Sequence, residues 1–431
     1  MSILSEDTRR SSVPATPSFH FSGRRVAAVV YSTYPADPRP RRAAEALAGE
    51  GASVEVICLK ETDEEPFREC FNGVKITRVP LKRRRGGKLS YLLQYGTFIL
   101  ASGAILAGRT LRRRYDVVHV HNMPDILVFS ALVPKLLGAR VILDLHDPMP
   151  ELMMAIFGLQ ENASSVRLLR ALEKCSLAFA DAVITVNETF KQIFLARSCP
   201  ARKINVVMNS PDEQIFQARR PAGRDPAKPF VIMYHGSLVE RHGLDLAVTA
   251  LAKLRQSIPS AELRVYGGST PFLEQVMDQV RQLQLGDAVR YLGRKKLEHI
   301  AEAIRECDVG IIPNRRSLFT ELNTPTRIFE YLSQGKPVIA PRTPGILDYF
   351  SEQELVFFEL GDADDLALKL EHVFRHPVEM LRMVDCGQAV YSIHRWSSER
   401  LRFLTLVDGL LKRGRQSLRR EPAPRSDFRR S

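Results

Sequence analysis

The sequence predicts an α/β protein built from two doubly wound parallel-sheet domains with a cleft between them. Its 431 residues exceed what one hydrophobic core usually serves, so at least two domains are expected. Short apolar segments alternate with helical segments in both halves, which is typical of parallel strands buried on both faces. A stretch rich in Pro, Arg and Ala at 211–229 interrupts this alternation and predicts a linker.

The first predicted domain, 23–210, contains seven apolar segments that read as strands. They lie at 26–31, 54–59, 74–79, 117–121, 141–145, 182–186 and 204–207. Helical patterns separate them at 39–49, 91–108, 125–137 and 165–180. Residues 1–22 are polar, lack the apolar stretch of a secretory signal, and are expected to be a disordered tail.

The second predicted domain, 230–390, repeats the alternation. Strands are predicted at 230–234, 261–266, 288–292, 308–312, 337–340 and 356–358. The helical patterns lie at 244–256, 271–285, 297–305, 325–333 and 364–374, where Asp362 is a natural N-cap. Helical sequence resumes at 391–411, and the basic segment 412–431 is expected to be a disordered tail.

The composition limits the classes of partner. Hydrophobic residues at 45 % and charged residues at 26 % exclude a mostly disordered or fibrous chain. The 62 Lys and Arg against 49 Asp and Glu give a net charge of +13, which calls for an anionic partner. Nucleic acid is not expected, because no recognition motif is present. The six cysteines form no CxxC pair, which indicates a reducing, cytoplasmic location.

The segment 91–108 carries no charge and is flanked by the basic clusters Arg83–Arg85 and Arg112–Arg114. Its length just reaches the roughly 18 residues of a membrane span, but Gln94 and Ser102 dilute it, which favours a buried or interfacial helix. A basic, apolar surface suits an anionic membrane at the inner face of the plasma membrane. A buried helix with solvated flanks is the alternative.

In the first half, ionisable residues gather where the strand 141–145 ends. Asp144, His146, Asp147 and Glu151 lie within eight residues of each other, and buried charges need partners, so a functional site is indicated. His146 is the best candidate because imidazole can donate, accept or titrate near neutral pH. His119 and His121 share a face of their strand, but no acidic or cysteine residue nearby in the sequence completes a metal site, so no metal is expected.

In the second half, the loop after strand 230–234 contains Gly236 and the cations Arg241 and His242 at a helix start, which is the chemistry of a phosphate cradle. Thr324 is a natural N-cap for the helix at 325. Arg327 in the first turn of that helix opposes the helix dipole, so an anionic ligand there is predicted. No P-loop, GxSxG or HExxH motif is present.

These residues stand in motifs that resemble a known family over about residues 24–411. The motifs are YSTYPADPRPRRAAEALAGEGASVEVI, YDVVHVHNMPD, LDLHDPMPE, HGSLVERHGLDLAV and, most specifically, PTRIFEYLSQGKPVIAPRTPG. They resemble the retaining GT-B glycosyltransferases of group 1 (family GT4). The resemblance implies two Rossmann-like domains, a nucleoside diphosphate sugar held mainly by the second, a glycan or lipid-linked acceptor, no metal or other cofactor, and a C-terminal helix returning to the first domain.

The resemblance and the strand-end positions together assign roles to individual residues. The expected catalytic residues are His146, Asp147 and Glu321. The expected donor-binding residues are Gly236, Ser237, Arg241, His242, Gly267, Arg294, Asn323, Thr324, Arg327 and Glu330. The expected acceptor-side residues are Tyr34, Asp37, Arg39, His121, Asn122 and Glu151.

The chain departs from the family pattern at three places. Leu322 stands where the first glutamate of the family's pair is usual, and the neighbouring Glu321 is expected to take its place. Ser237 and His242 replace the usual Arg and Lys of the phosphate loop, and Pro38–Pro40 replaces a Gly-Gly. A catalytically inactive binding protein of this fold, and a nucleotide-sugar epimerase, are therefore alternatives to a transferase.

Overall fold

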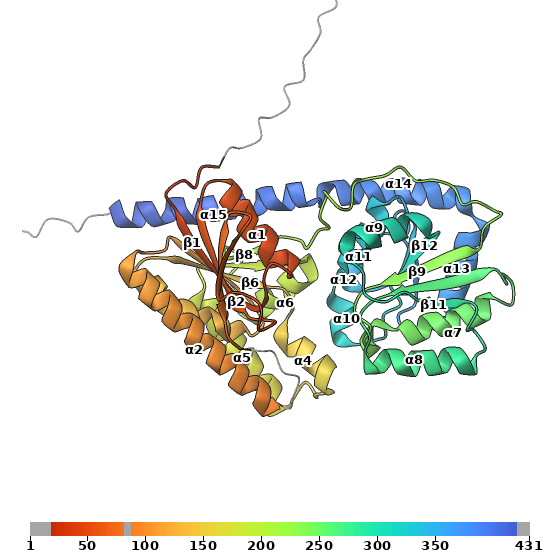
Figure 1. Cartoon of the computed structure of the whole chain (residues 1–431), viewed down its shortest axis with the longest axis horizontal. Helices are drawn as coiled ribbons and strands as arrows, with labels where there is room; N and C mark the ends of the chain where they lie inside the picture. The colour runs from red at the N-terminus through yellow and green to blue at the C-terminus, as the bar shows by residue number, and fades with distance from the viewer. Residues whose placement is uncertain (1–18, 82–87, 420–431) are drawn as a thin grey trace, which may run out of the picture.

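A computed structural model of the chain describes residues 19–81 and 88–419. The first domain contains β1 (Arg25–Thr33), α1 (Pro38–Gly49), β2 (Ser53–Leu59), β3 (Arg68–Phe71), β4 (Val74–Val79), α2 (Lys88–Arg112), β5 (Val117–His121), the 3-10 helix η1 (Asp125–Ala131), α3 (Leu132–Leu136), β6 (Arg140–Leu145), α4 (Met149–Phe157), α5 (Ser164–Phe179), β7 (Ala182–Thr185), α6 (Glu188–Arg197) and β8 (Ile204–Val206). Its strands form one sheet in the order β3-β4-β2-β1-β5-β6-β7-β8 (Figure 1).

The second domain contains β9 (Phe230–His235), the 3-10 helix η2 (Glu240–His242), α7 (Leu244–Leu254), β10 (Ala261–Tyr266), α8 (Pro271–Gln282), β11 (Val289–Tyr291), α9 (Leu297–Glu306), β12 (Val309–Ile311), α10 (Leu318–Leu322), α11 (Thr326–Ser333), β13 (Val338–Pro341), α12 (Pro344–Leu347), β14 (Val356–Phe358), α13 (Ala363–Arg375) and α14 (Pro377–Ile393). Its sheet has the order β11-β10-β9-β12-β13-β14 and is parallel throughout. The predicted α/β class with two parallel-sheet domains is thus confirmed.

Each sheet is covered on both faces, as the apolar strands require. In the first domain, α1 and the last helix, α15 (Trp396–Arg419), cover one face through side chains such as Leu47 and Phe403, while α2 and α6 cover the other through Phe98 and Phe190. In the second domain, α7, α8 and α13 pack on one face, and α9, α11 and α14 on the other. Both domains therefore bury their own cores.

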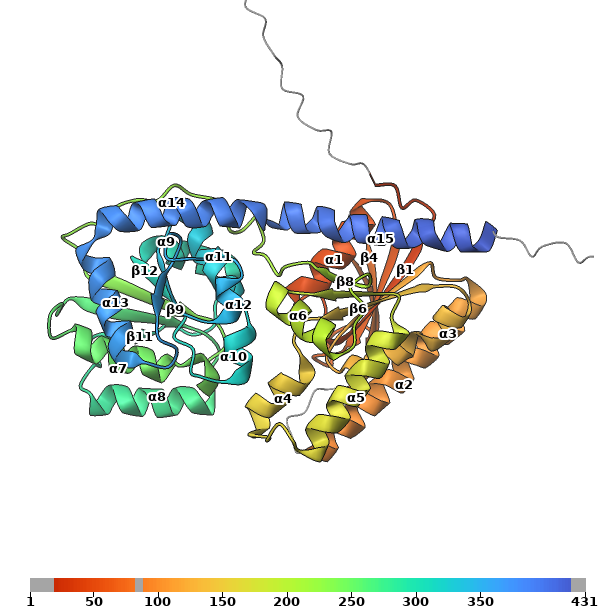
Figure 2. The ribbon, with the colours of Figure 1, turned by 180° about the vertical axis from the view of Figure 1, so that it is seen from behind.

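The chain returns to the first domain after leaving the second. Figures 1 and 2 show α14 leading directly into α15, which runs along the first domain. The buried carboxylate of Glu399 on α15 accepts a hydrogen bond from the backbone of Met208, and Arg400 pairs with Glu50 at 2.6 Å. The strand order reverses at β1 and at β9, and ligands of such sheets bind beyond the strand ends at these points.

Several elements differ from the expectation. The predicted helix 125–137 is split into η1 and α3, because Pro134 has no N–H to continue a helix. β3 was missed and pairs antiparallel with β4 at the sheet edge. The short helices α4, α6, α10 and α12 were also missed. Phe21, placed in a tail, is buried, and its N–H bonds to Glu50.

α15 continues to Arg419, past the end expected at 411. The other expected tail residues, 1–18 and 420–431, lie outside the described residues. The apolar segment lies within α2, and no helix in the described parts of the chain is long and apolar enough to cross a membrane. Arg83–Arg85 also lie outside the described residues.

Candidate active site

Two cavities lie between the domains. One of 690 Å³ lies between residues of both domains. Its lining includes Pro35, Pro38, Arg42 and Glu45 of the first domain, Asn209 and Asp212 between the domains, and Arg294, Thr326 and Glu330 of the second. The other, of 650 Å³, is lined by α4 on one side and by Glu240, Arg241 and 315–317 on the other. The strand ends of both sheets thus supply the walls of an interdomain cleft.

The packing around the loop between β9 and α7 requires glycine at two positions, one in this loop and one in the loop after β10. A Cβ on Gly243, whose φ is +65°, would lie 1.8 Å from the carbonyl oxygen of Pro313. A Cβ on Gly267, which follows β10, would lie 2.4 Å from the carbonyl oxygen of Gly236. Close backbone packing therefore fixes this loop and the backbone atoms that it presents to the cleft.

Arg327 projects from the first turn of α11 onto this loop. Its Nη1 donates to the carbonyl oxygen of His235 at 2.7 Å, and its guanidinium lies 5.0 Å from the centre of the Tyr234 ring. Gly236 lies directly against it, since a Cβ there would be 3.3 Å from Nη1. The helix start therefore carries a fixed positive charge beside a loop of backbone amides, as an anionic ligand would require.

Arg241 is a second cation at the same place. Burial lowers the pKa of its guanidinium, although the neighbouring Asp147 opposes this. Its Nε is buried and finds no hydrogen-bond partner among the described residues, so a buried donor is available to a ligand. Burial and Arg327 lower the pKa of His242 to about 3, so His242 is neutral, and its Nδ1 donates to Ser237. The positive charge here comes from Arg241 and Arg327.

Glu330 lies one turn after Arg327 on α11, at the 690 Å³ cavity. Its Oε2 is 3.2 Å from Nε2 of His235. Burial raises the pKa of Glu330 to about 7, against the opposing effects of Arg327 and Arg42. Arg42, which sequence reasoning missed, reaches the same cavity from α1 and donates to Asn209 at 2.7 Å. Nothing in its sequence context distinguishes Arg42 from other helix arginines.

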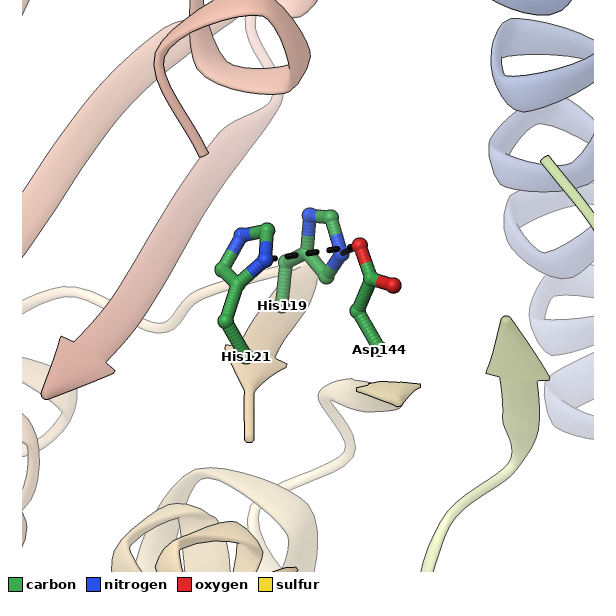
Figure 3. A group of neighbouring side chains, drawn as sticks. All are labelled: His119, His121 and Asp144. Carbon is green, nitrogen blue, oxygen red and sulfur yellow. Dashed lines mark ion pairs between the residues drawn. The ribbon is translucent and has the colours of Figure 1, made fainter. Parts of the chain in front are cut away.

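A buried cluster lies behind the strand end of β6. The register pairs His121 of β5 with Asp144 of β6, and His119 lies two residues earlier on the same face. Nε2 of His119 and Nδ1 of His121 are each 3.3 Å from Oδ2 of Asp144 (Figure 3). This corrects the expectation that no acid completes the histidine pair. Arg39 already bonds both Asp144 oxygens, at 2.7 and 3.1 Å, which favours a hydrogen-bonded cluster over a metal site.

The cluster holds His146 in place. Nε2 of His146 is 3.0 Å from Nδ1 of His121, and its backbone N–H donates to Asn122 at 2.8 Å. Burial lowers the pKa of His146 well below its ordinary value, although Asp144 opposes this. His146 is therefore neutral at pH 7, and its side chain is partly exposed. A neutral imidazole can exchange a hydrogen bond with a ligand hydroxyl but supplies no positive charge.

Five of the expected acceptor-side residues are buried, and their acceptor-side roles stay predictions. Tyr34 is 1 % exposed and belongs to the core between β1 and α1. Glu151 pairs with both terminal nitrogens of Arg197, at 2.9 and 3.2 Å. Arg39 is the partner of Asp144, and His121 and Asn122 support His146 from behind. Asp37 is partly exposed at the start of α1 and accepts a hydrogen bond from Ser32 at 2.7 Å.

The remaining predicted residues lie at the rim of the second domain. Glu321 is on α10, 3.4 Å from Nη1 of Arg316, and Arg294 is exposed beside the larger cavity. Thr324 is not the N-cap that was predicted. α11 begins at Thr326 with Pro325 as N-cap, because the Thr324 hydroxyl bonds to Gly345 and accepts from Asn187 of the first domain.

Asn323 has a buried side-chain oxygen without a partner among the described residues. Asp147 lies at the opposite side of the cleft, where burial raises its pKa to about 6 and Arg241 opposes this. The structure thus brings Asp147, Arg241 and Arg327 to one place between the domains. Their roles toward a substrate stay predictions.

Known proteins are similar to this chain. A sulfoquinovosyl transferase of Arabidopsis thaliana is 22 % identical over 287 residues, which are 63 % of this chain and 52 % of that protein, so the chain spans about half the length of this curated relative. Sucrose-phosphate synthase of Thermosynechococcus elongatus matches in structure with a TM-score of 0.74 at 18 % identity, over 90 % of this chain and 100 % of that one.

HepE of Anabaena, solved in complex with UDP-glucose, matches with a TM-score of 0.65 at 14 % identity, over 90 % of this chain and 99 % of that one. These likenesses confirm the GT-B fold. The model of the glycosyl transferase 4-like domain matches residues 36–210, and the model of glycosyl transferases group 1 matches residues 216–389. Since the two matches together take up most of the chain, the protein belongs to the group 1 glycosyl transferases of the GT4 type.

Proposed function

We propose that this protein transfers a sugar from a nucleoside diphosphate sugar to an acceptor hydroxyl, with retention of the anomeric configuration, in the synthesis of a glycan or glycolipid. The observation that carries the proposal is the pair of cations at the β9–α7 loop: Arg241 within the loop lines the smaller interdomain cavity, and Arg327 bonds to His235 where the loop begins. Solved relatives such as HepE hold UDP-glucose, which fits a donor diphosphate at this loop.

The reaction places negative charge on the departing phosphate. Two guanidinium groups and the backbone amides of the loop would stabilise that charge, so transfer is proposed to need no metal. The sugar carbon would develop positive character as the bond to phosphate breaks. The acceptor hydroxyl would attack from the face that the phosphate leaves, and the departing phosphate would take its proton.

Residues of both domains would position the donor and its sugar. Neutral His146 is proposed to exchange a hydrogen bond with a sugar hydroxyl, while Asp147 and Glu321 are proposed to contact the sugar or the acceptor. Glu330, at the larger cavity, is proposed to accept hydrogen bonds from the ribose of the donor. A direct test is a thermal-shift and hydrolysis screen with UDP-, GDP- and ADP-sugars. Stabilisation and slow hydrolysis with one donor support the proposal, whereas no response to any donor favours an inactive binding protein.

Donor affinity is expected to increase as the pH rises through about 7. The pKa of Glu330 is raised to about 7, so its carboxyl is protonated below this pH and charged above it. Only the charged form accepts hydrogen bonds at both oxygens, so the Kd of UDP should fall several-fold between pH 6 and pH 8. Isothermal titration at a series of pH values measures this dependence.

UDP itself has a phosphate that titrates near pH 6, so its binding changes with pH even without Glu330. The variant Glu330→Gln therefore provides the control. The Gln variant retains the nucleotide's own pH dependence and should lose the part that belongs to Glu330. An identical pH profile in the wild type and the variant would rule out the assigned role of Glu330.

The first domain also offers a surface for a membrane, where a lipid-linked acceptor would be found. The inward face of α2 carries Phe98, Ser102 and Leu106, which are buried. The outward face, at the same helical spacing, carries the uncharged stripe Leu93, Thr97, Leu100, Ala104, Gly108 and Leu111. Leu100 and Leu111 are about three-quarters exposed, and the exposed cluster Arg112–Arg114 follows. An apolar stripe beside a basic cluster fits an anionic membrane surface.

We therefore expect the protein to sediment with anionic phospholipid vesicles at low salt and to be released at high salt. The double variant Leu93→Glu/Leu100→Glu places charge in the lipid-facing stripe and should lower vesicle binding at least tenfold. Leu368→Glu, at an equally exposed leucine of α13, is the matched control and should bind as the wild type does. Failure of the wild type to sediment at low salt would reject the membrane surface.

A further inference from the structure

We propose that the corner between α13 and α14 binds a transition-metal ion of the zinc class through His372, His376 and Glu379. His372 lies in the last turn of α13, His376 separates the two helices, and Glu379 lies in the first turn of α14. One ligand atom of each residue lies within 4.8 Å of those of the other two. Imidazole nitrogen and carboxylate oxygen are ligands that zinc accepts.

The spacing of two of these atoms fits a shared ion. Nε2 of His372 is 3.2 Å from Oε1 of Glu379. Two ligands at about 2.0–2.1 Å from zinc, at a tetrahedral angle, lie about 3.3 Å apart. Without metal, a proton on Nε2 bridges these two atoms. When zinc binds, the hydrogen on Nε2 moves to Nδ1 by exchange with solvent, so the neutral ring turns the Nε2 lone pair toward the ion.

The orientation of His376 is a second and independent observation. Its Nδ1 lies 2.8 Å from the carbonyl oxygen of His372. A carbonyl oxygen only accepts hydrogen bonds, so Nδ1 carries the hydrogen and Nε2 of the neutral ring keeps its lone pair. Metal-binding histidines commonly donate their other ring N–H to a carbonyl in this way, which fixes tautomer and ring orientation. The His372 and His376 rings are also stacked, with centroids 4.2 Å apart.

The place of the corner gives the ion a structural consequence. The side chains of His372 and Glu379 are 38 % and 51 % exposed, so the ion can enter from solvent and keep a water as its fourth ligand. α14 leads into α15, which packs on the first domain (Figure 2). A metal at this corner would join α13 to α14 and fix the start of the returning helices.

The experiment is a titration of zinc into the untagged, chelator-treated full chain by isothermal calorimetry. We expect one zinc per chain and a zinc-dependent rise in Tm. His376→Ala and Glu379→Gln should each weaken zinc binding at least tenfold, and these exposed positions are not expected to affect folding. His299→Ala, at an exposed histidine of α9, is the control and should bind zinc as the wild type does.

Cobalt substitution identifies the ligands. The proposal requires a tetrahedral cobalt spectrum without a thiolate charge-transfer band, lost in the double variant His372→Ala/His376→Ala. Three results would each overturn it: no binding at micromolar zinc, binding unchanged in the double variant, or binding lost in His121→Ala. The last result would assign the metal to the buried cluster around Asp144.

Discussion

Replacing both Arg241 and Arg327 by alanine is expected to lower the rate of sugar transfer by about 10⁴-fold or more while the fold is retained. Each guanidinium group faces the place assigned to the donor diphosphate, and removing one preorganised donor of this kind commonly costs about 10²–10³ in rate. Nε of Arg241 finds no partner among the described residues, so its removal breaks no hydrogen bond at that atom. Arg327→Ala also removes the hydrogen bond to His235, so circular dichroism of the double variant must show that the fold is kept. The rate of nucleoside diphosphate release, monitored with a coupled enzyme assay, measures the effect.

The matched control is Arg281→Ala on α8, an arginine whose side chain is 70 % exposed. This variant also loses one positive charge, but at a position away from the cleft, and it should transfer sugar at the wild-type rate. Arg327→Lys adds a finer test, because lysine keeps the charge but not the planar fork. Transfer at the wild-type rate in the double alanine variant, with donor affinity unaltered, would refute the diphosphate assignment.

Asp144→Ala is expected to destabilise the protein by about 3–5 kcal/mol, since it leaves the buried guanidinium of Arg39 without its partner. Burial alone would raise the pKa of Asp144, but Arg39 and the histidines His119 and His121 hold it well below its ordinary value. The carboxylate therefore stays charged, bonded to Arg39 and 3.3 Å from a ring nitrogen of each histidine. Urea unfolding followed by circular dichroism measures the loss.

A double-variant cycle separates the ion pair from simple loss of packing. Asp144→Ala combined with Arg39→Met removes both charges and should be less destabilising than the sum of the two single changes. Asp287→Ala is the control, because its pairing with Arg255 is exposed and should contribute at most about 1 kcal/mol. Equal destabilisation by Asp144→Ala and Asp287→Ala would contradict the buried cluster.

Much of the fold could be predicted from the sequence, because parallel strands buried on both faces are continuous apolar runs. The segment 117–121 was predicted with the bounds that β5 has, and 261–266 with those of β10. Short helices were harder to predict. Prolines at 148 and 150 hid α4, and α6 has too weak an apolar pattern to stand out. The edge strand β3 is half exposed, and its sequence does not alternate between apolar and polar residues.

The candidate site was predicted in part, because residues after parallel strands must gather at one edge of a sheet. Arg241 and Glu330 accordingly line interdomain cavities, and Arg327 bonds to the start of the loop that carries Arg241. What the sequence could not show is which polar residues turn inward. The pairing of His121 with Asp144 depends on strand register, and the burial of Tyr34 and Glu151 depends on how their loops pack.

The central claim is that the cleft binds a nucleoside diphosphate sugar and breaks its bond between sugar and phosphate. Phosphorus NMR of the protein with each candidate donor tests this most directly, because the terminal phosphate shifts when it loses the sugar. We predict that one donor is converted to its nucleoside diphosphate by the wild type and by Arg281→Ala, but not by the Arg241→Ala/Arg327→Ala variant. Conversion at the same rate by all three proteins, or by none of them with any donor, would contradict the claim.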